Sequence, residues 1–451
     1  MAEKRPGSGG ARETIYPERA PQAAVPVPFF AAALVALALL EIVMVLRAEA
    51  LVLGWRHNPP VLVAVHLFLL GWGTTLIFGA AYQMAPVVLE GSLWRPDWPR
   101  LHLWLHGAGV AALVAGFWLW QPLWIASGGT LVLAGAVLFA LNLAVTLRQA
   151  RRRNPVGLGM AGSALYLLLT VGWGWTLALN LRLGFLGLAV DALVQHMVFG
   201  LAGWFTLMIV AAAYQLIPMF AVAPPPPARR VWWVTGGLAA APAVAVLSLA
   251  LLPGAAGDLG ARLAFLAEAG LLAAFVLDVW RMLRRRPPRP MEPPVRFAAA
   301  AVAAAALTVA WGVGLLLGLV PGGVRTQMAF AALVLLGWIG TMSVGQLYRI
   351  LPFVVWLHRF RHRRTPTERI PFLHEMAPRP AANWILGLWV PGVALQVVGF
   401  GLGHGGVLRL GSLAAAAAVA VFVRVMVGVI RHLQVPPGAP GEPPGLRPEG
   451  T

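Results

Sequence analysis

Long apolar runs alternate with short polar loops along the whole chain, in a pattern typical of a membrane protein. A helix needs about 20 mainly apolar residues to cross the hydrocarbon core of a bilayer, and runs of that length recur from one end of the chain to the other. We therefore predict an all-α integral membrane protein with twelve transmembrane helices. The predicted spans cover residues 25–46, 59–89, 101–124, 126–147, 157–179, 192–222, 231–252, 259–283, 297–320, 327–357, 382–402 and 407–430.

The second, sixth and tenth spans share a motif that divides the chain into repeats. In each, a Gly–Trp pair is followed by Tyr ten residues after the Trp, and by Pro four residues after the Tyr. The tryptophans are Trp72, Trp204 and Trp338, so the copies lie 132 and 134 residues apart. Constant spacing over three copies indicates an internal repeat of four spans. We expect three pseudo-threefold four-helix arcs at 25–156, 157–290 and 291–432, with a tail at 1–24 and a disordered, Pro- and Gly-rich tail at 433–451.

Composition and the placement of charge support this class. The chain is 59% hydrophobic and 11% charged, which excludes an ordinary soluble or disordered protein. The formal charge of +18 comes from arginines in short loops beside the spans, as the positive-inside rule expects, and does not indicate nucleic acid. With twelve spans, the basic loops alternate without exception with nearly neutral ones. We expect a multi-pass protein of the bacterial cytoplasmic membrane, with both termini in the cytoplasm.

The absence of cysteine narrows the chemistry. Disulfides, iron–sulfur clusters and thiolate metal sites all need cysteine, so they are excluded.

The three motifs place polar side chains near the cytoplasmic ends of their spans. One hypothesis is a shared polar cluster around the axis, in which Arg349 would have a partner because charges inside a helix bundle usually do. The alternative is that Tyr and Trp are interfacial anchors and that Pro ends each helix. The candidate cluster comprises Tyr82, Gln83, Tyr214, Gln215, Tyr348 and Arg349.

Four histidines and two acids within the predicted spans are candidates for a function. His66 lies roughly 10 Å below the outer end of the second span, and His196 lies at a similar depth in the sixth. Imidazole in lipid needs a partner, and the candidates are heme iron or a hydrogen bond between helices. We interpret His102 and His106, at the start of the third span, as interfacial polar residues. The intramembrane acids, Glu41 and Glu268, could belong to a proton path or pair with a neighbour.

The stretch 66–86, HLFLLGWGTTLIFGAAYQMAP, resembles the helix-2 region of subunit I of the heme–copper oxidase superfamily, particularly its cbb3 oxidase and nitric oxide reductase branches. That subunit also has twelve spans in three four-helix arcs. Its helix-2 histidine ligates the low-spin heme on the outer side, so the resemblance implies a b-type heme on His66. The resemblance covers most of the chain by topology but only the second span by motif.

The chain departs from this family at its other metal ligands. The family places heme ligands on helix 10, where this chain has no histidine and only Met328 as a soft candidate. The family's copper site needs one histidine on helix 6, for which His196 could stand, and a pair on helix 7, where this chain has none. We therefore expect no copper and no complete oxidase. Heme-binding membrane proteins of nitric-oxide stress, which also have twelve spans, are similar in kind.

Three functions remain open from the sequence. The first is a heme protein with His66 as a ligand, and His196 or Met328 as the second, acting in electron transfer, in response to NO or O2, or in support of respiratory partner subunits. The second is a transporter or channel whose path is lined by Gln83, Gln215, Arg349, Glu41 and Glu268. The third is a structural or assembly subunit without a cofactor.

Overall fold

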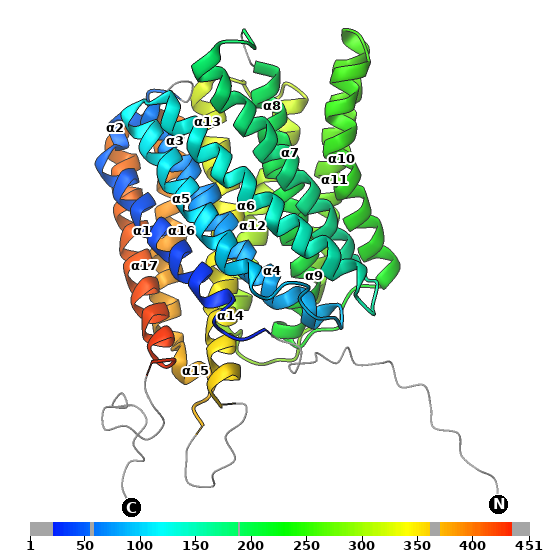
Figure 1. Cartoon of the computed structure of the whole chain (residues 1–451), viewed down its shortest axis with the longest axis vertical. Helices are drawn as coiled ribbons and strands as arrows, with labels where there is room; N and C mark the ends of the chain where they lie inside the picture. Colours follow the sequence, from blue (N-terminus) through cyan, green and yellow to red (C-terminus); the bar gives the residue numbers. More distant parts are fainter. Residues whose placement is uncertain (1–20, 55–57, 188–189, 361–369, 435–451) are drawn as a thin grey trace, which may run out of the picture.

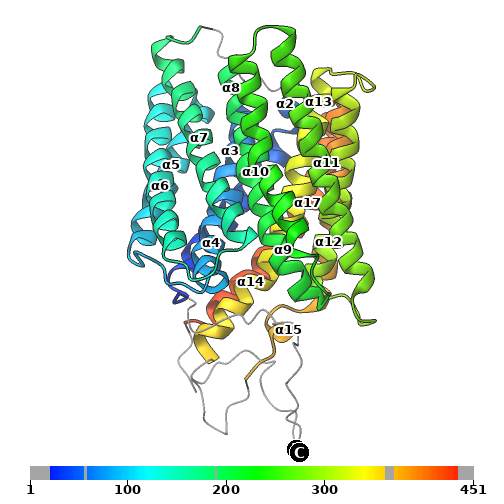
Figure 2. The ribbon, with the colours of Figure 1, turned by 90° about the vertical axis from the view of Figure 1, so that its right-hand side faces the viewer.

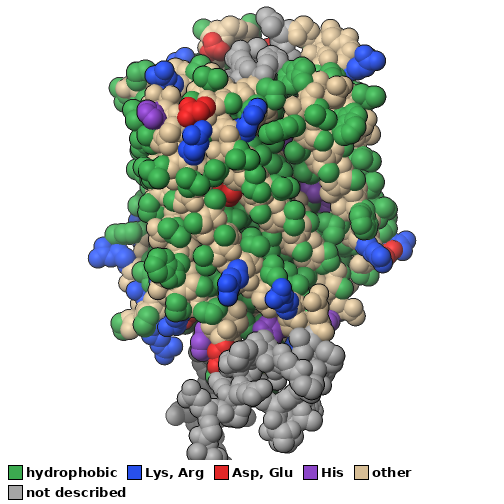
Figure 3. All heavy atoms as spheres, turned by 90° about the vertical axis from the view of Figure 1, so that its left-hand side faces the viewer, with side chains coloured by type: hydrophobic (Ala, Val, Ile, Leu, Met, Phe, Trp, Pro, Cys, Tyr) green, Lys and Arg blue, Asp and Glu red, His purple; other side chains and the backbone are tan. Residues whose placement is uncertain are grey.

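The computed structural model describes residues 21–54, 58–187, 190–360 and 370–434, and in these residues every regular element is helical. The predicted tails therefore lie mostly outside the described residues, as does the basic segment 361–369. Twelve helices in this part of the chain are long and apolar enough to span a membrane, which confirms the predicted number of spans. Figure 3 shows one face of the molecule, where hydrophobic side chains predominate and the basic ones lie mainly toward the two ends.

Nine spans are single α-helices and three are composite. The single ones are α1 (Pro26–Leu46), α5 (Trp98–Leu119), α6 (Pro122–Arg148), α7 (Pro155–Leu183), α10 (Ala228–Leu251), α11 (Ala255–Arg285), α12 (Pro293–Leu316), α16 (Arg379–Leu402) and α17 (Gly405–Arg431). The composite spans run over Pro59–Val88, Asp191–Ala221 and Val324–Phe360, and they are the three that carry the repeated motif. Two short helices, α2 (Ala48–Leu51) and α15 (Leu373–Met376), lie in loops.

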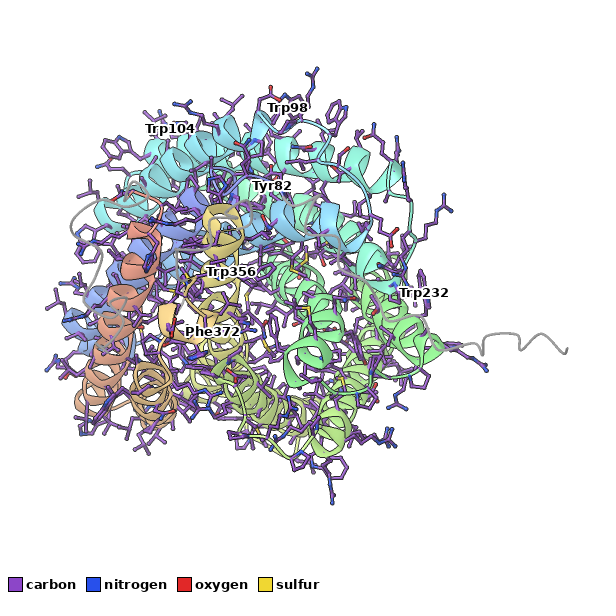
Figure 4. The ribbon with its side chains drawn as sticks, turned by 90° about the horizontal axis from the view of Figure 1, so that it is seen from below. Tyr82, Trp98, Trp104, Trp232, Trp356 and Phe372 are labelled. Carbon is purple, nitrogen blue, oxygen red and sulfur yellow. The ribbon has the colours of Figure 1, made fainter. Side chains whose placement is uncertain are left out.

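The single helices surround the composite ones. α1 packs on α17, so the first and last spans lie side by side, and the same contact recurs between α6 and α7 and between α11 and α12. The colours follow one another around a ring when the molecule is seen from below (Figure 4), and α1 lies beside α17 in Figure 1. Figure 2 shows the spans running roughly parallel along the long axis. The composite spans are 67%, 67% and 72% buried over their most apolar stretch, whereas no other span exceeds 44%.

Each composite span contains an eight-residue π-helix. The first consists of α3 (Pro59–His66), η2 (Leu67–Thr74) and α4 (Thr75–Val88). The other two are α8 (Val190–Val198), η3 (Phe199–Thr206) and α9 (Leu207–Ala221), and α13 (Val324–Ala332), η4 (Leu333–Gly340) and α14 (Thr341–Phe360). The Gly–Trp pair lies inside the π-helix each time. π-Helical turns are rare and often occur at functional sites.

The glycine of each Gly–Trp pair lets the first span of its repeat approach closely. A Cβ on Gly71 would lie 2.7 Å from the Cβ of Ala36, and a Cβ on Gly203 would lie 2.3 Å from the ring of Tyr166. On Gly337 it would lie 3.3 Å from the Cβ of Ala304. Helices in a membrane gain stability from such close packing, because lipid gives no hydrophobic drive for association.

Aromatic side chains connect each composite span to the next one. A phenylalanine from the fourth span of each repeat lies between the motif tyrosine of its own repeat and the motif tryptophan of the next, with ring centroids 5.3–6.4 Å apart. Such distances are typical of favourable aromatic pairs. The three sets are Tyr82–Phe139–Trp204, Tyr214–Phe275–Trp338 and Tyr348–Phe422–Trp72.

Two of the three indole groups also donate hydrogen bonds between composite spans. Trp72 Nε1 donates to Ser343 Oγ at 3.1 Å, and Trp204 Nε1 donates to Thr74 Oγ1 at 2.9 Å. The motif tryptophans and tyrosines are at most 5% exposed. The alternative that they are interfacial anchors is therefore wrong, because an anchor needs contact with lipid headgroups.

We expect Gly203→Ala to destabilise the protein, because the new methyl group would overlap the ring of Tyr166. Overpacking of this kind costs about 1–3 kcal/mol. Gly172→Ala is the matched control, since no atom lies within 4 Å of its added Cβ. The measurement is the apparent melting temperature of the purified protein, followed by tryptophan fluorescence. Equal melting temperatures for the two variants would contradict the close approach of these spans.

Candidate functional site

His66 and His196 lie close enough to interact electrostatically, although 130 residues separate them in the chain. His66 is the last residue of α3, and His196 lies near the end of α8. Both are half-buried. The sequence placed them at similar depth on neighbouring repeats, and their electrostatic interaction agrees with that placement.

The ring orientation of both histidines is set by the same kind of hydrogen bond. His66 Nδ1 lies 2.8 Å from the carbonyl oxygen of Leu62, and His196 Nδ1 lies 2.8 Å from that of Thr170. A carbonyl only accepts, so in each ring Nδ1 carries the proton and donates. Nε2 is then left with its lone pair. This is the arrangement in which histidines ligate metals in proteins, since the second-shell carbonyl fixes the tautomer and the ring.

The packing around the two rings holds them in place. The ring of Phe117, from α5, lies with its centroid 4.8 Å from that of His66. The ring of His196 lies against Gly174 of α7, where a Cβ would come within 2.9 Å of its Cε1. A larger residue at Gly174 would displace the imidazole.

Met328 lies among different neighbours. It is half-buried near the start of α13, which packs mainly on α16, α12 and η4, whereas α3 packs mainly on α5, α1 and η2. Among the described residues there is no group of three or more His, Cys, Asp or Glu side chains that could hold a metal ion. Heme iron differs from such an ion because it needs only one or two axial ligands from the protein.

The three motif tyrosines contact three separate partners. The Tyr82 hydroxyl shares a hydrogen bond with His102 Nδ1 at 3.0 Å, Tyr214 donates to Asp278 Oδ2 at 3.0 Å, and Tyr348 donates to the Pro378 carbonyl at 2.7 Å. Figure 4 shows Tyr82 inside the ring of helices, whereas Trp98, Trp104 and Trp232 lie at its periphery.

The polar residues next to these tyrosines differ in their surroundings. Gln83 is buried and its Oε1 has no hydrogen-bond partner within the described segments, while Gln215 is half-buried. Arg349 lies 5.7 Å from the ring centroid of Phe220 and interacts electrostatically with Glu292. Arg349 thus lies against an aromatic ring, and the ion pair of Glu292 is with Arg379.

His102 and His106 are fully buried, so their interpretation as interfacial residues is wrong. His106 Nε2 lies 3.0 Å from Thr75 Oγ1 and 3.2 Å from the Leu70 carbonyl oxygen. The Thr75 hydroxyl donates to the same carbonyl at the end of the π-helix. His102 Nε2 and His106 Nδ1 have no partner among the residues that the structure describes. Their position at the start of a span indicated depth, but not that the side chains face inward onto Phe78.

Asp278 is a buried charge that sequence reasoning missed. It is 2% exposed in α11, and Arg230 Nε lies 2.6 Å from its Oδ1 and 2.7 Å from its Oδ2. Arg281 lies 3.6 Å away and Tyr214 donates a third contact. An acid in an apolar run, six residues before an arginine run, was the available signal in the sequence.

The two acids predicted within spans have fewer partners. Glu41 is 3% exposed in α1, and its Oε2 has no partner in the described part of the chain. Glu268 is half-buried in α11 and interacts electrostatically with Tyr166. The Tyr166 hydroxyl is inserted into α10, where it donates to the Ala239 carbonyl and accepts from Ala243 N–H next to Pro242.

We expect Asp278→Asn to lower stability, because Arg230 and Tyr214 would lose a charged acceptor. Hydrogen bonds to charged groups contribute about 1.5–3 kcal/mol. Asp258→Asn, at an exposed position in the first turn of the same helix, is the control and should leave the melting temperature unchanged. If Asp278→Asn has the same melting temperature as the wild type, the buried cluster contributes nothing to the stability of the fold.

Comparison with known proteins does not assign the chain to a family. No protein-family model matches it, and no curated protein matches its sequence. The resemblance of residues 66–86 to heme–copper oxidase subunit I stays a prediction. The geometry of His66 and His196 is therefore the main basis for a functional proposal.

Proposed function

We propose that this protein has the fold of heme–copper oxidase subunit I and binds one b-type heme between His66 and His196. The proposed fold consists of three four-helix arcs around a pseudo-threefold axis. Three sets of contacts support it, each recurring once per repeat. They are the close approach at Gly71, Gly203 and Gly337, the aromatic bridges between successive repeats, and the packing of α1 on α17, α6 on α7 and α11 on α12.

The observation that carries the heme proposal is the pairing of the two histidines. Each donates Nδ1–H to a carbonyl and keeps an Nε2 lone pair, and the two rings come from different repeats and interact electrostatically. His66 and His196 would hold the heme iron, and Met328 is not needed. When bound, heme would supply one-electron chemistry or a site for NO or O2 at its iron. The side chains of Phe117 and the backbone at Gly174 would orient the rings.

The proposed function does not include oxygen reduction at a heme–copper pair. α10, the seventh span, contains no histidine, so this chain cannot supply the copper ligands that the family places there. We propose a role in electron transfer, in the response to NO or O2, or in support of a respiratory complex. The membrane would be the bacterial cytoplasmic one, with the end that holds Pro26 and Arg431 facing the cytoplasm because the basic loops gather there.

A second candidate function is ion or proton transport. Glu41 supports it, because a buried carboxyl group with an unpartnered oxygen inside a span is typical of transport paths. Within the described residues, aromatic ring contacts connect each composite span to the next, which favours the heme protein over a conducting path.

The purified protein is expected to show a b-type reduced-minus-oxidised optical spectrum with about one heme per chain. His66→Ala should lose most of the heme, because one of the two imidazoles that would hold it is removed. His374→Ala, at an exposed histidine, should keep the wild-type heme content and spectrum. A folded wild-type protein without a Soret band after expression with heme supply would reject the heme proposal and favour transport, which Glu41→Gln would then test in proteoliposomes.

A further inference from the structure

A cavity of about 70 Å3 lies between the three composite spans. Holding one water takes only about 10–15 Å3 of volume measured with a water-sized sphere, so this space exceeds a single water several-fold. The lining comes from α4, α9 and α14, the ends of η2, η3 and η4, and Met160 of α7. The cavity is separate from the candidate heme ligands, because neither His66 nor His196 lines it.

The lining residues occupy corresponding positions in the three repeats. Counted from the motif tryptophan, each composite span contributes the first, fourth, fifth, eighth and twelfth residues, a helical spacing that places them on one face. At the fifth position these are Ile77, Ile209 and Ser343. The corresponding faces of the three composite spans therefore line the same cavity. This places the cavity on the axis that relates the repeats.

Few polar groups reach this space. Ser343 Oγ is engaged with Trp72 Nε1 and with carbonyls of its own helix, and Gln346 Nε2 contacts Met342 Sδ at 3.5 Å. Gln346 Oε1 is buried and has no partner among the described residues. A water needs two to four polar partners, which this lining does not provide, and apolar cavities of this kind stay dry and take up small apolar molecules.

We propose that this axial cavity is a binding site for a small apolar gas molecule of diatomic size. Its lining consists mainly of Ala, Ile, Leu and Met side chains, which give dispersion contacts, and it contains no charged residue. Methionines such as Met84, Met208 and Met342 adapt to the shape of a small guest because their side chains are flexible and polarisable. The inference goes beyond the proposed heme and does not depend on it.

Xenon is the probe for this site, since it is apolar, of similar size and visible in density maps. We would determine the structure of the full-length His66→Ala protein with and without xenon pressure, so that heme content does not affect the result. A xenon peak on the axis between Ala80, Ala212 and Gln346 is expected. Ala212→Leu should fill the space and abolish the peak.

Two further variants keep the test decisive. Ala80→Leu fills the cavity from another span, in case Ala212→Leu does not fold. Ala267→Leu, on the exposed side of α11, should retain the axial peak. The absence of axial xenon in the folded protein, or ordered water or a lipid chain in that space, would overturn the proposal. Retention of the peak in both filling variants would equally overturn it.

Discussion

The structure depends on the packing of the three composite spans, each of which contains a π-helix, against one another. Lipid offers no hydrophobic drive for helices to associate, so close contacts and complementary aromatic rings must provide it. Gly71 and Gly203 permit the close contacts, and the rings of Phe139, Phe275 and Phe422 each connect one repeat to the next. The remaining nine spans then surround these three, and the first and last spans meet side by side.

This packing also explains where the chemistry is located. The composite spans carry His66 and His196 in α3 and α8, immediately before or close to their π-helices. The second and sixth spans carry the same motif, and their histidines lie close enough to interact electrostatically. The Leu70 carbonyl in η2 accepts from the Thr75 backbone N–H at the end of this π-helix and also bonds the Thr75 hydroxyl and the His106 ring. The same spans thus position the candidate ligands and enclose the axial cavity.

Hydropathy and motif spacing are properties of the sequence alone. They predicted the number of spans, their boundaries within a few residues, and the special role of spans 2, 6 and 10. The burial of His102 was missed because depth along a span does not tell which way a side chain faces. Asp278 was missed for a related reason, since its partner Arg230 comes from another helix. The π-helices depend on contacts between spans, and only the Gly before each Trp signalled such a close approach.

Electron paramagnetic resonance of the oxidised, purified protein tests most directly whether His66 and His196 hold one heme together. We expect a low-spin ferric signal typical of two imidazole ligands in the wild type. In His196→Ala we expect a high-spin signal, because only the imidazole of His66 would remain to bind the iron. A high-spin signal in the wild type, or an unchanged low-spin signal in His196→Ala, would contradict the proposed site.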